Sequence, residues 1–195
     1  MPINDFLTCP TDCTTAVTLP AISAVQDCSS YDQDFSQVWG FIYRPMDNSA
    51  PDPYTDWATT PTATVGAIDN TEALNAKCKQ LVGIGGVDVP ELTVNTYPKK
   101  TERVVNREYT LRFRVLQLDA ANYEFLRKLQ CGSTDFTFYY ENMGDWVFGK
   151  VGGIEPKSID VEFPLGSGDD DKQYAEIIVK WDADADPERR VDPLA

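Results

Sequence analysis

Histidine, which is frequent in catalytic and metal sites, does not occur anywhere in this 195-residue sequence. It is the commonest general base at neutral pH and the commonest zinc ligand, so its absence excludes serine or cysteine catalysis through a histidine partner. A serine–lysine or carboxylate mechanism stays open, because 31 residues are Asp or Glu. However, spacing along a sequence does not show that two such groups converge in a pocket. We therefore expect a protein that is not an enzyme, and we assign no catalytic residue.

Three of the five cysteines, Cys9, Cys13 and Cys28, lie close together near the start of the sequence. Three thiolates could hold zinc if an Asp or another chain supplied the fourth ligand, but paired Cys-x-x-Cys knuckles are missing. The first residues also lack the basic-then-apolar pattern of a signal peptide, which favours synthesis in a cytoplasm. A cytoplasm keeps thiols reduced. We predict free thiols, with a disulfide that forms late in oxidising surroundings as the alternative.

A second group of possible metal ligands is the alternating series Asp182, Asp184 and Asp186. This series has the opening spacing of a calcium-binding loop, in which carboxylate oxygens surround the ion. However, Pro187 stands where that loop needs glycine, and Pro193 stands where it needs glutamate. A solvated acidic tail is the simpler interpretation, so we expect neither a metal nor a cofactor.

Charge is distributed unevenly along the chain, whose formal net charge is −14. Residues 1–98 hold 3 basic and 12 acidic residues, residues 99–132 hold 8 and 4, and residues 133–195 hold 6 and 15. The three segments therefore carry −9, +4 and −9. Binding of nucleic acid by counterion release needs clustered Lys and Arg, so we expect no specific binding of DNA or RNA. The basic middle of one copy could instead face an acidic part of another, and such contacts would weaken in high salt.

Alternation of apolar and polar residues predicts a mainly β fold with one helix. The residues 103–118 predict a long, half-buried strand, in which the odd-numbered residues from 109 to 115 are apolar and the even-numbered ones are polar. Asp119 precedes a helical pattern at 120–130 and is a candidate N-cap. Further strands are predicted at 91–97, 135–141, 146–150, 159–163 and 174–181. A β-sandwich or partly closed barrel with one flanking α-helix and extended terminal arms would bury these faces.

The chain before residue 81 is rich in proline and shows little sustained periodicity. An apolar island at 37–44 predicts one strand, and 70–81 predicts a short helix capped by Asn70, although a strand competes for its end. The glycine-rich stretch 83–86 predicts a flexible turn. The predicted parts are a proline-rich N-terminal arm at 1–80, a β-sandwich core at 81–181 with a helix at 119–131, and an acidic C-terminal arm at 182–195.

Several aromatic residues of the N-terminal segment would be costly to leave in water. We take Trp39, Phe41 and Trp57 as candidate subunit contacts, on the hypothesis that a neighbouring subunit orders this arm. A surface loop region that contains one strand is the alternative. Exposed tryptophans, Trp146 among them, could instead stack on sugars, in which case the protein would be a carbohydrate-binding or adhesive module.

The order of elements from about 81 to 181 resembles that of phage tail tube proteins and tail-tube-like neck proteins. The segments that carry this resemblance are 109–118, 119–129, 136–150 and 159–181. The resemblance implies a β-sandwich with a flanking helix that joins its neighbours in rings, commonly hexamers, which stack into a tube. It also implies an acidic inner wall, from which phosphates are repelled so that DNA passes without specific binding.

Four arginines, Arg103, Arg107, Arg112 and Arg114, depart from an all-acidic wall. We take them as candidate subunit contacts, and an ordinary solvated strand face is the alternative. The expected protein is thus a structural virion protein, made in the cytoplasm of a bacterial host, whose partners are its own copies and neighbouring virion proteins. A capsid decoration or head–tail joining protein is a further alternative. No apolar run approaches the roughly 20 residues of a membrane helix, so no membrane partner is expected.

Overall fold

The computed structural model describes residues 37–46, 50–71, 77–96, 102–131, 135–164 and 173–194. Within these residues the protein is mainly β with a single helix, so the predicted fold class is confirmed. The predicted thiol group at Cys9, Cys13 and Cys28 and the first 36 residues of the predicted N-terminal arm lie outside the described residues.

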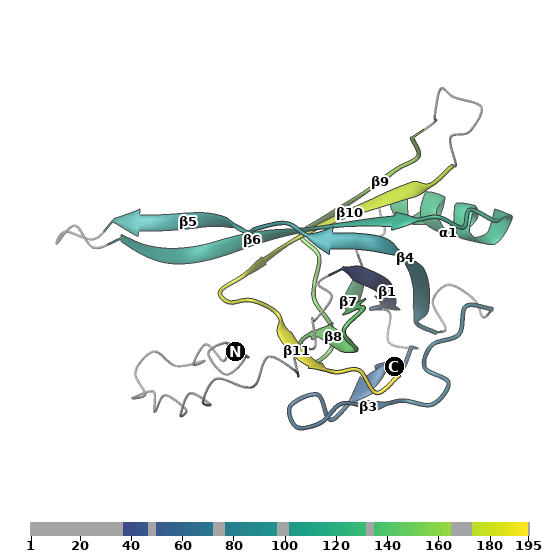
Figure 1. Ribbon diagram of the computed structural model, residues 1–195, viewed down its shortest axis with the longest axis horizontal. Coiled ribbons are helices and arrows are strands. Elements are labelled where there is room, and N and C mark those ends of the chain that lie inside the picture. Colours follow the sequence, from purple (N-terminus) through teal and green to yellow (C-terminus); the bar gives the residue numbers. More distant parts are fainter. Residues whose placement is uncertain are drawn as a thin grey trace, which may run out of the picture. The chain divides into compact units, whose positions relative to one another are not determined.

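One antiparallel sheet contains nine of the described strands (Figure 1). Its order is β11-β8-β7-β1-β4-β6-β10-β9, and β5 pairs with β6 beside this path. The strands are β1 (Val38–Pro45), β4 (Lys79–Val87), β5 (Glu91–Thr96), β6 (Glu102–Val115), β7 (Phe136–Asn142), β8 (Trp146–Gly149), β9 (Ser158–Glu162), β10 (Ala175–Ala183) and β11 (Glu188–Val191).

The alternation predicted around residue 110 is confirmed in β6. Tyr109, Leu111, Phe113 and Val115 are buried, whereas the Arg residues between them are exposed. Strand β10 is the direct partner of this segment and buries its own alternate residues, in the register Trp181↔Tyr109 to Ala175↔Val115. Matched apolar faces on neighbouring strands create one continuous wall of the core.

The sheet curls at β4, which lies between β1 and β6 and pairs with them at different points along its length. Residues 79–85 pair with β1, and residues 84–87 pair with β6. The curl brings β7 against β10, where the ring centroids of Phe138 and Trp181 lie 5.5 Å apart. This arrangement supports a partly closed barrel. The glycine-rich stretch 83–86 was predicted as a turn, and this prediction is wrong because these residues belong to β4. Residues 79–81, for which a strand competed with the predicted helix, also belong to β4, while residues 72–76 of that predicted helix lie outside the described residues.

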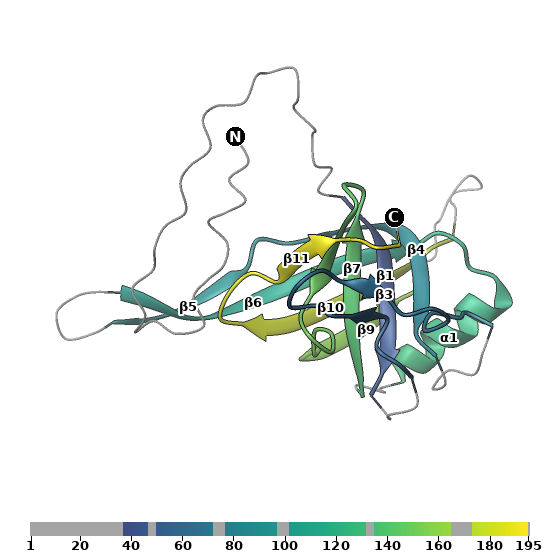
Figure 2. The same ribbon diagram turned by 90° about the horizontal axis from the view of Figure 1, so that it is seen from below.

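Strand β1 lies between β4 and β7 in the sheet, so the predicted boundary between arm and core at residue 80 falls too late. The sheet here is buried on both faces. Phe41 belongs to the main core, while Ile42 and Tyr139 pack on the opposite face against residues of the segment 50–78. That segment contains the hairpin of β2 (Tyr54–Thr55) and β3 (Thr62–Ala63), which lies across β1 and β7 in Figure 2.

Helix α1 (Ala120–Gln130) forms at the predicted residues. The Asp119 side chain accepts a hydrogen bond from the backbone N–H of Asn122 at 2.8 Å, which satisfies one of the unpaired donors of the first turn. Leu126 and Leu129 are buried in the main core. The Gln130 side chain donates to the carbonyl of Val161 in β9 at 2.7 Å, so the helix shields part of this sheet edge.

The C-terminal segment is not a free arm. After β10 the chain turns and β11 pairs antiparallel with β8, in the register Glu188↔Gly149 to Val191↔Trp146. The prediction of an arm beginning at 182 is therefore corrected: residues up to 183 still belong to β10, and 188–191 extend the sheet at its other edge.

Candidate interaction surface

The aromatic residues proposed as subunit contacts lie mostly inside this chain. Phe41 is fully buried in the main core, where its ring stacks 5.4 Å from that of Phe138. Trp57 is buried in the second cluster and its indole N–H donates to Glu188 at 3.0 Å. Trp39 is half-buried. Phe41 and Trp57 thus contribute to intramolecular packing, which corrects the prediction that they face a partner.

Two of the four candidate arginines make ion pairs within the chain. Arg112 pairs with Asp88 at 3.3 Å and Arg114 pairs with Glu176 at 3.5 Å, and both arginine side chains remain about half exposed. Arg107 donates to the backbone carbonyl of Asp184. For Arg103 the structure describes the backbone, which pairs with Asn95. Assignment of these residues to subunit contacts stays a prediction.

The alternating aspartates do not converge as a calcium loop would require. Asp182 pairs with Lys157 at 3.1 Å, the backbone carbonyl of Asp184 accepts from Arg107, and Asp186 accepts from the hydroxyl of Tyr109. Across the described ranges no three His, Cys, Asp or Glu side chains gather closely enough to hold a metal ion. These aspartates instead fasten the end of β10 and the following turn to β6.

Two cysteines, Cys78 and Cys131, lie among the described residues, and their surroundings differ. Cys78 is buried in the second cluster and Cys131 is exposed, and both are free thiols. Burial raises the pKa of Cys78 to about 11, so little thiolate forms at neutral pH.

A hairpin extends from the sheet where β6 runs past its other partners (Figure 1). The pairing of β6 with β10 ends at Arg107, and the pairing of β6 with β4 covers residues 111–114. Within the described chain, residues 102–106 therefore have β5 as their only strand partner, and the other edge of β5 is unpaired. We call this two-stranded part, residues 91–96 and 102–106, the hairpin arm.

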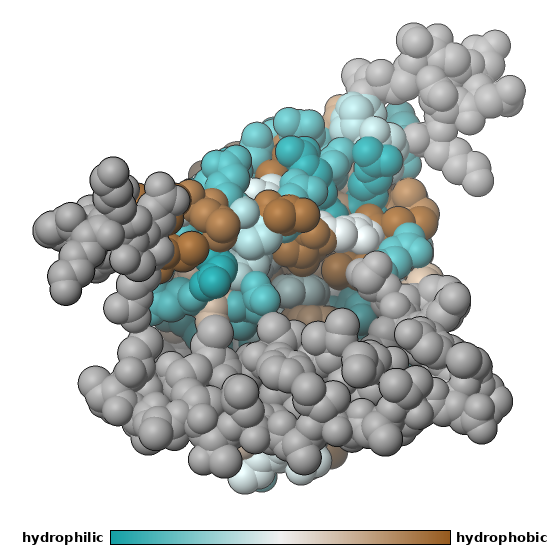
Figure 3. All heavy atoms as spheres, turned by 60° about the vertical axis from the view of Figure 1, so that its left-hand side comes forward, coloured by the Kyte–Doolittle hydropathy of each residue, from teal (hydrophilic) through white to brown (hydrophobic). Residues whose placement is uncertain are grey.

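The hairpin arm carries apolar side chains that no described part of the chain covers. Val94 and Val104 are direct cross-strand partners, and their side chains are 47% and 36% exposed. Leu92 on β5 and Val105 on β6 are also exposed, as is Val89 just before β5. Figure 3 shows hydrophobic side chains at the surface of the face turned toward the viewer. An isolated two-stranded hairpin is at best marginally stable in water, so uncovered apolar residues on one suggest a partner.

The base of the hairpin arm is held by charges. Glu91 and Glu108 are cross-strand partners, which by itself would be repulsive. Lys157 and Lys180 both pair with Glu108, and Lys157 also pairs with Asp182. The hydrogen bond from Lys157 lowers the pKa of Glu108, so this carboxylate stays ionised. These ion pairs hold the base of the hairpin arm in place beside β10.

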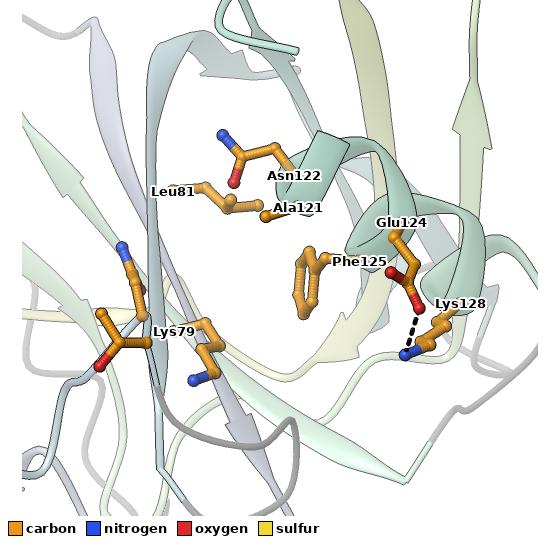
Figure 4. Close-up of a pocket in the computed structure, with 9 residues that line it drawn as sticks. Lys79, Leu81, Ala121, Asn122, Glu124, Phe125 and Lys128 are labelled. Carbon is orange, nitrogen blue, oxygen red and sulfur yellow. Dashed lines mark ion pairs between the residues drawn. The ribbon is translucent and has the colours of Figure 1, made fainter. Parts of the chain in front are cut away.

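Apart from the hairpin arm, a concave region lies between α1 and β4 (Figure 4). It has a volume of about 260 Å³ and combines apolar side chains, Leu81 and Phe125, with the ion pair Glu124–Lys128. This pair is exposed and spans one helical turn, which is ordinary helix-surface chemistry. Its lining also includes the buried Lys79, whose ammonium group donates to the backbone carbonyl of Asp69, and we assign this region no role.

The sequence predicted the two strands of the hairpin arm, but not that their pairing with β4 and β10 would end before the arm begins. Residues 91–96 and 102–106 have the ordinary texture of half-buried strands. Only the pairing register shows that β10 and β4 stop short of the arm.

Comparison with known proteins gives a single similarity to report. No protein-family model matches the sequence. No curated protein matches it either. A solved chain from a "virion of native gene transfer agent (GTA) particle" is similar with a TM-score of 0.37 and 13% identity, over 59% of this chain and 92% of that chain. We base no functional conclusion on a similarity of this size. In the described part of the chain, no helix is long and apolar enough to cross a membrane.

Proposed function

We propose that this protein is a non-enzymatic structural subunit that associates with copies of itself through the hairpin arm. The observation that carries the proposal is the combination of uncovered apolar side chains on the arm with the unpaired outer edge of β5. Burying an exposed Val or Leu side chain contributes on the order of 1.5–3 kcal/mol, and a second strand could complete the edge. Burial of four or five such side chains would offset part of the entropy cost of association.

A more specific role follows from the order of elements and the charge. We propose a tail tube or neck subunit of a bacteriophage virion, in which copies form rings, with six subunits as the first expectation. The net charge of −14 suits a channel that lets DNA pass without binding it. The other partners would be neighbouring virion proteins, as they also would be for a capsid decoration or head–tail joining role.

The carbohydrate-binding alternative receives less support from the tryptophans. Trp57 is buried in the second cluster. One ring face of Trp146 is taken by Arg189, whose guanidinium carbon lies 4.3 Å from the ring centroid. Sugar stacking needs an open aromatic face, which the buried Trp57 does not offer, and at Trp146 one of the two faces is already occupied.

The self-association proposal is tested with the variant Val94→Asp. A charge at a buried contact should weaken association at least tenfold, which corresponds to about 1.4 kcal/mol. Light scattering after size exclusion measures the mass as a function of concentration, and electron microscopy shows whether rings or tubes form. Val151→Asp is the matched control, because Val151 is 71% exposed in a turn away from the arm.

Two results would contradict the proposal. One is a wild-type protein that remains a monomer at the highest concentration it tolerates. The other is a Val94→Asp variant that associates as well as wild type and Val151→Asp. Thermal unfolding of each variant, followed by circular dichroism, verifies that a loss of association is not a loss of fold.

A further inference from the structure

Two acidic residues from different strands meet in the interior of the protein. Glu141 on β7 is fully buried, and Asp192, directly after β11, is 5% exposed. The carboxyl groups of these two residues interact in the same buried space. Two neighbouring carboxylates with little access to water repel each other, so the pair is most stable when one of the two carries a proton.

The site is shaped for the Glu141 carboxyl group. The Tyr54 hydroxyl donates to one of its oxygens at 2.9 Å, and the Gln80 side chain donates to the other at 2.9 Å. Gly40 on the neighbouring strand β1 leaves space for this carboxyl group, because a Cβ at that position would lie 2.2 Å from a Glu141 oxygen. An acidic side chain is therefore accommodated by neighbours from β1, β2 and β4.

The surroundings of the pair favour its protonated form. Burial is the largest cause of the raised pKa of Glu141, about 7, and Asp192 raises it further. The pKa of Asp192 is also raised, by burial first and then by Asp145 in the β7–β8 turn. Tyr54 and Tyr139 face the same space, and burial raises the pKa of both hydroxyls, so they stay neutral and add no charge.

Asp192 is the buried anchor of the C-terminal segment. The four residues of β11 are exposed or half-buried, and so are the two described residues after Asp192. Asp192 donates its backbone N–H to the carbonyl of Asp145 and accepts at its side chain from the N–H of Leu194, each at 2.8 Å. β11 also makes side-chain contacts, but no other residue between 188 and 194 is buried.

We propose that the Glu141–Asp192 pair is a proton-dependent latch that holds β11 against β8. With one proton shared, the pair anchors the C-terminal segment. Without it, two negative charges lie together in a buried site that Asp145 makes still more negative, and Asp192 leaves toward water. Release takes β11 away from β8 and leaves the backbone groups of that edge unpaired.

The direction of the pH dependence follows from the raised pKa. The folded pair binds its proton more tightly than separated carboxyl groups do, so its stabilising effect is complete below the ordinary Glu pKa. The effect is lost as the pH rises toward and through about 7. Between pH 5 and pH 8 the opening equilibrium of β11 should increase by roughly tens of fold, and it should change little above that.

Hydrogen–deuterium exchange of the full chain tests the latch. The protection of peptides that cover 188–194 is measured at pH 5 and pH 8 and corrected for the intrinsic pH dependence of amide exchange. In wild type this protection should fall by tens of fold, while that of peptides from β6 and β10 stays constant. The Glu141→Gln variant keeps a neutral donor toward Asp192, so its protection should be nearly independent of pH.

A second variant guards against a folding failure of the first. Asp192→Asn supplies an amide donor to Glu141 and should likewise remove the loss of protection at high pH. Glu162→Gln on exposed β9 is the matched control and should behave as wild type. The latch would be refuted by equal protection at both pH values in wild type. It would also be refuted by a wild-type pH dependence in both Glu141→Gln and Asp192→Asn.

Discussion

Gly85 and its neighbour Gly86 show how closely single residues of β4 are constrained. A Cβ on Gly85 would lie 2.4 Å from the backbone carbonyl oxygen of Arg112 and 2.9 Å from the ring of Phe113. A Cβ on Gly86 would meet no atom within 4 Å. Backbone atoms of a paired strand cannot move aside cheaply, so the first position tolerates no side chain, whereas the second does.

We therefore expect Gly85→Ala to lower the free energy of unfolding by about 1–3 kcal/mol, as overpacked core positions do. Gly86→Ala is the matched control and should change it by less than about 1 kcal/mol. Urea denaturation with linear extrapolation measures both. Equal stability of the two variants would show that β4 and β6 are farther apart than the structure indicates.

At the scale of elements, α1 is the part in which local signals and structure agree most closely. Asp119 was a candidate cap from sequence and is the observed cap, with its carboxylate on the N–H of Asn122. Arg127 and Lys128 lie in the last turn, where positive charge favours the helix dipole. Capping depends on residues a few positions apart, which explains why it was predictable.

Asp119→Ala should lower the free energy of unfolding by about 0.5–2 kcal/mol, because an N–H of the first turn loses its acceptor. Asp119→Asn retains a side-chain oxygen and should cost much less. Thermal unfolding followed by circular dichroism distinguishes the two. A cost for Asn as large as that for Ala would mean that the charge of Asp119 matters more than the hydrogen bond.

The hairpin arm shows the opposite situation at the same scale. The strands at 91–97 and around 103 were expected, and β5 and β6 begin within a residue of those positions. Both strands were expected to lie within the β-sandwich core at 81–181. Among the described residues β5 has one strand partner, and the apolar residues of this hairpin are exposed. A local pattern indicates that a side chain prefers burial, but only distant strands decide whether this chain provides it.

For the molecule as a whole, the charge segments seen in the sequence are partly neutralised within one chain. The basic stretch lies in β6 and α1, and acidic residues of β10 and of the β4–β5 connection pair with two of its arginines. Glu108, one of the four acidic residues of this stretch, is in turn held by Lys157 and Lys180. Fewer of these charges are therefore available to another copy than the count along the chain suggested.

This changes the expected response of association to salt. If the apolar residues of the hairpin arm are the main contact, association should weaken less than tenfold in about 1 M NaCl, where the Debye length falls to roughly 3 Å. Sedimentation velocity at low and high salt provides the measurement. A steep loss of association in salt would restore the earlier expectation, in which arginines such as Arg103 and Arg107 meet acidic surfaces of a neighbour.

The sequence by itself determined the features that depend on neighbouring residues: the mainly β class, most strand positions, the helix with its cap, and the lack of histidine chemistry. Tertiary structure decided which residues share an environment. It placed β1 inside the sheet, paired β11 with β8, and buried Glu141 beside Asp192 although 50 residues separate them in the chain. It also left the hairpin arm without a partner. Side-chain alternation is a local property, whereas strand pairing and burial arise from contacts between distant segments, which no local pattern specifies.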